Sequence, residues 1–329
     1  MPMAYHLKQK TMKFITAILI SLCVFNYNSF AKSAIKLNCV YVDNRIILEI
    51  QSSKGKTLNF LFDTGSNDFL VDSAVAFEYN LCNSGSKKFG ASFPNGQVRG
   101  KFFSSSKLFK NDSLNALYSY GVAIKISQQN IGSRIKIDGI IGVNRAIEKL
   151  VTMIDFEDNT FEILTSIPVN TSKNSFQIGL IYTDNGYGAG LSEYYKKLSA
   201  TRAKFYISNE VFINTNISID TGSNIDFVLL TSQNIDSLIK KINKPYESIN
   251  KKQSLGNNLT TEYKFKADSI VVDNLILKKD ITMNLTPADK MINISFGSLK
   301  TFGLIGAPFL KQYKRVFFDY PAQRLLIEK

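Results

Sequence analysis

The pentapeptide Asp-Thr-Gly-Ser-Asn occurs twice in the chain, at residues 63–67 and 220–224, which places the two copies 157 residues apart. Each copy follows a run in which apolar residues alternate with other residues, Leu58–Phe62 in the first case and Ile213–Ile219 in the second. Alternation of this kind is typical of a β-strand. Self-similarity at a fixed distance indicates a duplicated architecture. The chain is therefore expected to contain two copies of one unit, in which a strand leads into an acidic turn.

The similarity continues downstream of each acidic turn. A glycine, two branched apolar residues and a second glycine stand at residues 139–142 and 303–306, and the second glycine follows the aspartate of the turn by 79 and 86 residues. The other shared elements are a short candidate helix, an aspartate 13 residues after the second glycine, and a closing apolar strand: Arg145–Leu150 and Pro308–Tyr313, Asp155 and Asp319, and Thr160–Leu164 and Arg324–Ile327. Matching spacing over so many elements indicates internal duplication.

The pattern predicts an all-β fold with few short helices, built as two lobes with a pseudo-twofold internal duplication. The N-terminal lobe is expected over residues 32–167 and the C-terminal lobe over residues 176–329. Residues 168–175 are polar and patternless, which is typical of a linker between lobes. The helices expected inside the lobes are Ser73–Tyr79, with Asp72 as its cap, Leu191–Ala200 and Ser232–Ile242.

Residues 1–31 have the pattern of a signal peptide. Lys8, Lys10 and Lys13 precede twelve mostly apolar residues, Phe14–Phe25, and the small residues that follow suit cleavage after Ala31. The run is shorter than the roughly 20 residues that a membrane-spanning helix needs. We therefore expect export to the periplasm or secretion, with no integral membrane span after processing. The alternative is that the segment is retained as an anchor.

The net charge is +13, of which residues 32–329 carry +10. A basic exported protein can associate weakly with an anionic envelope surface, although a solvated basic surface is the more ordinary interpretation. No basic strip interleaved with aromatic residues is present, so we expect no nucleic-acid partner. Both copies of the acidic turn are on one chain, and we expect a monomer.

The only histidine is His6, which lies in the expected signal peptide. Its loss excludes Ser-His-Asp and Cys-His catalysis and all histidine-ligated metal sites in the mature chain. We therefore expect no metal and no cofactor. Cleavage also leaves two cysteines, Cys39 and Cys82, which form either one disulfide bridge or two separate thiols.

A pseudo-twofold axis between duplicated lobes would bring Asp63 and Asp220 face to face around one water. Like charges at that distance cannot both ionise easily, so the pair shares a proton. One aspartate can then act as general base on the water while the other donates a proton to a carbonyl oxygen. The glycine of each turn lets the backbone approach the carboxylate, and the hydroxyls beside it can orient the carboxylate.

These motifs resemble those of pepsin-like, two-lobed aspartic peptidases, and the short lobes are also similar to the bacterial retropepsin-like group. The resemblance rests on FDTGSN at 62–67, DGIIG at 138–142, IDTGSN at 219–224 and GLIG at 303–306. It covers roughly residues 35–329 and implies an aspartic protease fold, an exported aspartic endopeptidase of bacterial origin and a peptide or protein substrate. Such enzymes use a pair of aspartates that share one proton.

The resemblance also implies roles for single residues. Asp63 and Asp220 would be the catalytic pair, and Thr64 and Thr221 would interlock across the lobe interface. The residues that would support the carboxylates are Gly65, Ser66, Gly222 and Ser223. The segments that contain Gly142 and Gly306 would cross behind each acidic turn.

Pepsin-like enzymes close the cleft with a hairpin flap that carries a tyrosine. The corresponding segment here is about Ala91–Arg99, and its Asn95-Gly96 dipeptide is typical of a hairpin turn. The substrate-binding flap residues would be Phe93, Pro94, Asn95 and Gly96, without a tyrosine. Together with Phe69 and Phe227, which follow the two acidic turns, Phe93 leads us to expect a preference for apolar side chains around the cleaved bond. The alternative is that these phenylalanines belong to the core.

Two other functions compete with peptide hydrolysis. A catalytically silent protease-like binding or inhibitor protein usually lacks an aspartate of the pair or the glycine after it, and both are intact here. A glycosidase also uses two carboxylates, but it needs an acid and a nucleophile in different surroundings. Two copies of one turn argue against such asymmetry.

Overall fold

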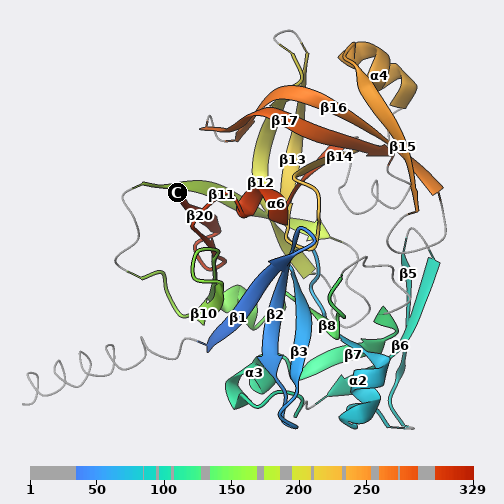
Figure 1. The fold of residues 1–329 in the computed structure, drawn as a ribbon, viewed down its shortest axis with the longest axis vertical. Helices are drawn as coiled ribbons and strands as arrows, with labels where there is room; N and C mark the ends of the chain where they lie inside the picture. Colours follow the sequence, from blue (N-terminus) through green and yellow to red (C-terminus); the bar gives the residue numbers. More distant parts are fainter. Residues whose placement is uncertain are drawn as a thin grey trace, which may run out of the picture.

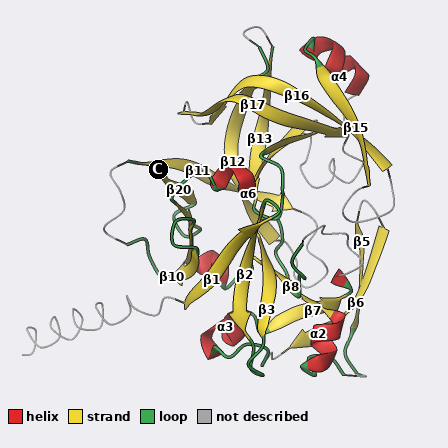
Figure 2. Cartoon of the chain, viewed as in Figure 1, coloured by secondary structure: helices red, strands yellow, loops and turns green. Residues whose placement is uncertain are grey.

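The computed structural model describes residues 35–83, 85–93, 96–104, 107–126, 134–168, 174–185, 195–208, 211–231, 235–252, 259–272, 275–287 and 301–329. Most of the described residues lie in β-strands, and the helices among them are few and short (Figure 2). The prediction of an all-β fold is confirmed. The expected signal peptide and residues 169–173 of the expected linker lie outside the described residues.

The N-terminal half begins with an antiparallel meander and continues through two parallel pairings. Its strands are β1 (Ile35–Val42), β2 (Arg45–Gln51), β3 (Thr57–Asp63), β4 (Phe69–Asp72), β5 (Lys88–Phe93), β6 (Gly96–Ser104), β7 (Tyr120–Ile124) and β8 (Gly139–Gly142). Neighbouring strands follow the order β1-β2-β3-β8-β4-β7-β6-β5. The pairs β3–β8 and β4–β7 are parallel, and the others are antiparallel.

The C-terminal half repeats this order strand by strand. Its strands are β11 (Ser175–Asn185), β12 (Tyr195–Tyr206), β13 (Phe212–Asp220), β14 (Phe227–Thr231), β15 (Tyr246–Lys252), β16 (Leu259–Val272), β17 (Leu275–Pro287) and β18 (Thr301–Gly306). They pair in the order β11-β12-β13-β18-β14-β17-β16-β15, again with the third and fifth pairs parallel. In Figure 1, β13–β17 lie in the upper part of the view and β1–β3, β7 and β8 in the lower part.

Four further strands join the halves: β9 (Val151–Asp155), β10 (Thr160–Leu164), β19 (Arg315–Asp319) and β20 (Arg324–Glu328). With β1 and β11 they form an antiparallel series in the order β1-β10-β9-β19-β20-β11. At its centre Met153 pairs with Phe317, and on either side Asp155 pairs with Arg315 and Val151 with Asp319. Because Asp155 and Asp319 hold the same place in the repeat, this register is unchanged when the two copies are exchanged.

The described helices are α2 (Ser73–Glu78), α3 (Asp112–Leu117), η2 (Ile147–Lys149), α4 (Ile235–Ile242) and α6 (Ala307–Leu310). The predicted cap of α2 is confirmed, because the Asp72 carboxylate accepts a hydrogen bond from the N–H of Ala74 at 2.9 Å. None of the helices within the described ranges is long and apolar enough to cross a membrane.

The prediction of a helix over Leu191–Ala200 is wrong. Residues 195–200 belong to β12 and pair with β11, and the pairing of β12 with β13 begins at Ala200. The local sequence contains good helix formers, but pairing with a neighbouring strand satisfies backbone groups in the sheet, and tertiary pairing outweighs weak helix propensity. The hairpin predicted near Asn95 is confirmed, because Phe93 pairs with Gly96 at the end of β5 and β6.

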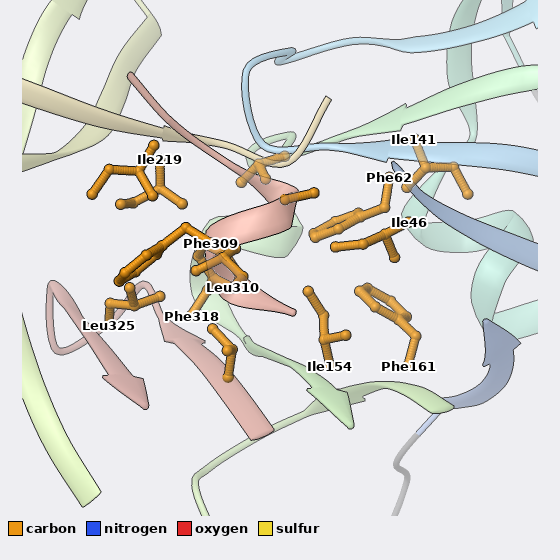
Figure 3. Packing of buried hydrophobic residues seen from close by; sticks show 14 of the residues in the cluster. Ile46, Phe62, Ile141, Ile154, Phe161, Ile219, Phe309, Leu310, Phe318 and Leu325 are labelled. Carbon is orange, nitrogen blue, oxygen red and sulfur yellow. The ribbon is translucent and has the colours of Figure 1, made fainter. Parts of the chain in front are cut away.

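One apolar cluster beneath the two acidic turns contains residues from both halves. Figure 3 shows Phe62 of β3 and Ile219 of β13 in this cluster, together with Phe309 of α6 and Phe318 of β19. The rings of Phe62 and Phe318 lie 6.3 Å apart. Because the last apolar residue before each acidic turn is anchored in the same core, the ends of β3 and β13 are held at fixed positions.

Candidate active site

Asp63 and Asp220 occupy matching positions at the ends of β3 and β13. Asp63 pairs with Gly142 in a parallel register, and Asp220 pairs with Gly306 in the same way. Each aspartate is therefore the last residue of its strand, and it lies beside the glycine that ends the neighbouring parallel strand.

The two carboxylates converge on one point between the turns. A Cβ atom added at Gly65 would lie 2.6 Å from Oδ1 of Asp220 and 2.7 Å from Oδ1 of Asp63. A Cβ added at Gly222 would lie 2.7 Å from Oδ1 of Asp63. Because both oxygens surround the same glycine, any larger residue at Gly65 would displace at least one carboxylate.

Each carboxylate is oriented by the glycine of its own turn. The N–H of Gly65 donates to Oδ1 of Asp63 at 2.7 Å, and the N–H of Gly222 donates to Oδ1 of Asp220 at 3.0 Å. Hydrogen bonds from an amide to a carboxylate are stronger than those between neutral groups. The glycines predicted to support the carboxylates are therefore placed to do so.

Thr64 and Thr221 interlock between the halves with four hydrogen bonds. The N–H of Thr64 donates to Oγ1 of Thr221 at 2.9 Å, and the N–H of Thr221 donates to Oγ1 of Thr64 at 3.1 Å. The Thr64 hydroxyl donates to the carbonyl of Ile219, and the Thr221 hydroxyl donates to the carbonyl of Phe62, both at 2.8 Å. Both threonines are buried, so these bonds set the relative position of the two turns.

Ser66 and Ser223 shape the turns that hold the aspartates. The Ser66 hydroxyl accepts a hydrogen bond from the N–H of Asp68 at 3.2 Å, and the Ser223 hydroxyl accepts from the N–H of Ile225 at 3.4 Å. The carbonyl of Ser66 also accepts from the N–H of Val143 at 2.9 Å, which ties the first turn to the strand end beside it. The serines therefore stabilise the loop backbone in both copies.

A second pair of aspartates, Asp68 and Asp226, was missed by the sequence analysis. The carbonyl of Asp68 accepts from the N–H of Gly142 at 3.1 Å, and the carbonyl of Asp226 accepts from the N–H of Gly306 at 3.0 Å. The two residues are therefore equivalent, although Ile225 adds one residue to the second turn. The Asp-Phe dipeptide that follows both turns was the available signal.

The two residues differ in their surroundings. Burial raises the pKa of the Asp68 carboxyl to about 6. Oδ2 of Asp226 lies 4.0 Å from Nζ of Lys278. The repeat therefore has a half-buried carboxyl with a raised pKa beside the first turn and a carboxyl group near a lysine beside the second.

The expected cleft residues Phe69 and Phe227 belong to the core, so that part of the specificity prediction is wrong. Phe69 is 2% exposed and Phe227 is 0% exposed. The Phe69 ring lies 5.3 Å from that of Tyr118, and the Phe227 ring lies 5.3 Å from that of Phe309. Each phenylalanine is the first residue of a strand, and its side chain faces the sheet interior.

The predicted flap hairpin consists of β5 and β6, with Phe93 and Gly96 as its terminal pair. Pro94 and Asn95 lie outside the described residues. The hairpin follows β7 and β4 in the strand order of the N-terminal half, so it continues the sheet that contains the first acidic turn.

A small cavity of about 20 Å³ is lined by Thr64, Glu148, Ile219 and Tyr320, among other residues. This volume holds about one water. Burial raises the pKa of the Glu148 carboxyl.

Within the described part of the chain, no group of three or more histidine, cysteine, aspartate or glutamate side chains could hold a metal ion.

Cys39 and Cys82 are free thiols, which decides between the two possibilities left open by the sequence. Cys39 is buried in β1, and burial raises the pKa of its thiol to about 12. Cys82 is partly exposed. No bridge between them contributes to the fold.

A search against models of protein families finds no match for this chain. No curated protein sequence matches it.

Proposed function

We propose that the chain is an exported aspartic endopeptidase that hydrolyses peptide bonds with a water activated between Asp63 and Asp220. The observation that carries the proposal is that a Cβ atom built on Gly65 would lie 2.6 Å from Oδ1 of Asp220 and 2.7 Å from Oδ1 of Asp63, so an oxygen of each carboxylate lies beside the same glycine. The matching hydrogen bonds from the N–H groups of Gly65 and Gly222 orient both carboxylates in the same way.

The chemistry follows from two carboxylates that share one proton. The ionised aspartate removes a proton from the water as its oxygen attacks the peptide carbonyl carbon, and the protonated aspartate donates its proton to the carbonyl oxygen. The aspartate that took the proton from the water then gives it to the nitrogen of the tetrahedral intermediate as the C–N bond breaks, and one hydroxyl of the intermediate returns its proton to the other aspartate as the new carbonyl forms. Each aspartate thus exchanges one proton in each direction, and the pair returns to its starting state.

The fold that we propose is the two-lobed aspartic protease fold with a pseudo-twofold internal duplication. The repeated strand order and the exchange symmetry of the β9–β19 register support it. The lobes would be residues 32–167 and 176–329, joined by residues 168–175. Since one chain supplies both aspartates, a monomer suffices for catalysis.

The hairpin of β5 and β6 would close the cleft over a peptide or protein substrate, in the periplasm or outside the cell. A catalytically silent binding or inhibitor protein is the competing function. The presence of both aspartates and of the glycine two residues after each one favours catalysis, because a binding protein has no need for either oriented carboxylate.

The test is hydrolysis of a mixed peptide library by the purified mature chain between about pH 3 and pH 8, with Asp63→Asn and Asp220→Asn alongside. Each substitution keeps the side-chain volume and removes one half of the acid–base pair, so activity should fall by about 10³-fold or more. Asp112→Asn, at an exposed helical position, is the matched control and should keep full activity. Full activity in Asp63→Asn or in Asp220→Asn would reject the assignment of these two aspartates as the catalytic pair. Peptide binding without cleavage by the unmodified chain would favour the binding protein.

A further inference from the structure

The sheet of the C-terminal half has an outward surface on which aromatic, aliphatic and lysine side chains are neighbours. Strands β13, β12, β16 and β17 are adjacent there, and directly opposite residues of antiparallel strands lie on the same face. Two rows cross the four strands: Phe212, Tyr206, Ser269 and Lys279, and Asn214, Lys204, Val271 and Ile276. We call the six residues Lys204, Tyr206, Phe212, Val271, Ile276 and Lys279 the basic-aromatic face.

The alternation of β12 shows that this face points away from the core. Ala203 and Phe205 are buried, and successive residues of a strand point to opposite sides of the sheet. Lys204 and Tyr206 therefore lie on the outer side. Phe212 is 45% exposed and Ile276 is 54% exposed, so large apolar side chains on this face are in contact with solvent.

Lys204 is positioned among the aromatic rings. Its Nζ lies 3.8 Å from the ring centroid of Phe212 and 4.8 Å from that of Tyr206. The two ring centroids are 6.2 Å apart. Attraction between an ammonium group and ring faces keeps the charge beside the apolar surface. The result is a positive charge level with exposed aromatic groups.

The basic charge of the protein is concentrated in this half. Residues 169–329 contain 21 Lys and Arg against 14 Asp and Glu, which gives +7, whereas residues 35–168 contain 15 against 13, which gives +2. None of the eight positions in the two rows is acidic. Because equal charges repel, a second copy of the chain is a poor occupant for this face.

We propose that the basic-aromatic face docks the protein on the surface of an anionic lipid bilayer. Phe212 and Ile276 would enter the boundary between headgroups and acyl chains, and Lys204 and Lys279 would reach lipid phosphates. A soluble polyanion would satisfy the lysines alone and leave the exposed apolar side chains in water. Charge complementarity together with this apolar exposure therefore favours a lipid surface. The proposal is independent of catalysis by Asp63 and Asp220.

The chain contains no tryptophan, which allows a sharp test. Phe212→Trp places a single tryptophan on the basic-aromatic face, and Phe77→Trp places one on α2 of the N-terminal half, where Phe77 is 83% exposed. Vesicles of phosphatidylglycerol should shift the emission of Phe212→Trp to shorter wavelength, and vesicles of phosphatidylcholine should not. The emission of Phe77→Trp should not change with either lipid.

Flotation of the mature chain with the same vesicles measures the contribution of each side chain. Lys204→Gln and Lys279→Gln should each weaken partitioning by about fivefold, and Phe212→Ser by about tenfold. The charge-matched control Lys107→Gln should match the unmodified chain, and circular dichroism reports whether each variant is folded. Failure to bind phosphatidylglycerol would overturn the proposal. So would binding that folded Phe212→Ser and Ile276→Ser leave unchanged, since that would indicate adsorption by charge alone.

Discussion

Thr64 and Thr221 each donate to and accept from the opposite half of the protein. Each threonine N–H donates to the hydroxyl of the other residue, at 2.9 and 3.1 Å, and each hydroxyl donates onward to a backbone carbonyl at 2.8 Å. Since the adjacent residues are Asp63 and Asp220, the distance between the two carboxylates depends on this contact.

Substitution of Thr64 by valine keeps the shape of the side chain but removes both hydrogen bonds of the hydroxyl. It also leaves the N–H of Thr221 and the carbonyl of Ile219 buried without that partner, so we expect the free energy of unfolding to fall by about 1–3 kcal/mol. Urea unfolding measures it. Thr57→Val is the control, since the exposed Thr57 hydroxyl makes only a surface hydrogen bond with Gln51. Equal losses in both variants would show that the buried contact has no special role.

Gly65→Ala tests whether the carboxylates need the space around the glycine. The added Cβ would lie 2.6 Å from an oxygen of Asp220, closer than real Cβ atoms approach any atom, so at least one carboxylate must move. A displacement of about 1 Å at a catalytic group costs roughly 100-fold in rate, and we expect a loss of that size in peptidase activity. At Gly85 the nearest atom to an added Cβ is at 3.4 Å, and Gly85→Ala should retain activity within about twofold. Comparable activity in the two variants would contradict a catalytic role for the carboxylates of Asp63 and Asp220 that lie beside Gly65.

The repeat in the sequence predicted the all-β class and the two matching strand-and-turn units, because two copies of one unit share the spacing between strands, glycines and aspartates. The spacing of the repeat does not predict whether Phe69 and Phe227 are buried. An aromatic residue after a turn can face a cleft or a core, and the choice depends on partners such as Tyr118 and Phe309 that lie far away in the sequence. Pairing of β12 on both sides likewise depends on distant strands.

The thiols should differ strongly in reactivity. Cys39 is buried and its pKa is raised to about 12, so it is protonated and covered in the folded chain, whereas Cys82 is partly exposed. Alkylation of the native protein followed by peptide mass mapping should modify Cys82 at least about 100-fold faster, because Cys39 must wait for local unfolding. Denaturant should remove the difference. Recovery of a peptide in which the two residues are bridged would show that the thiols are not free.

Asp68 should make stability depend on pH in a definite direction. Burial raises the pKa of its carboxyl from an ordinary value of 3.8 to about 6 in the folded chain. Between these values the folded state holds a proton that the unfolded state has released, so the contribution of this proton to stability is present below 3.8 and is lost as the pH rises through 6. Above that range, burial of the ionised carboxylate costs up to about 3 kcal/mol.

Asp68→Asn keeps the size of the side chain and removes its titration. Relative to the unmodified chain, the variant should change little in stability at about pH 4 and should become more stable by up to about 3 kcal/mol at about pH 8. Urea unfolding at the two pH values measures the difference, and Asp112→Asn, at an exposed position of α3, should show a much smaller one. A stability difference for Asp68→Asn that is the same at both pH values would show that partial burial beside the first turn does not raise the pKa of this carboxyl.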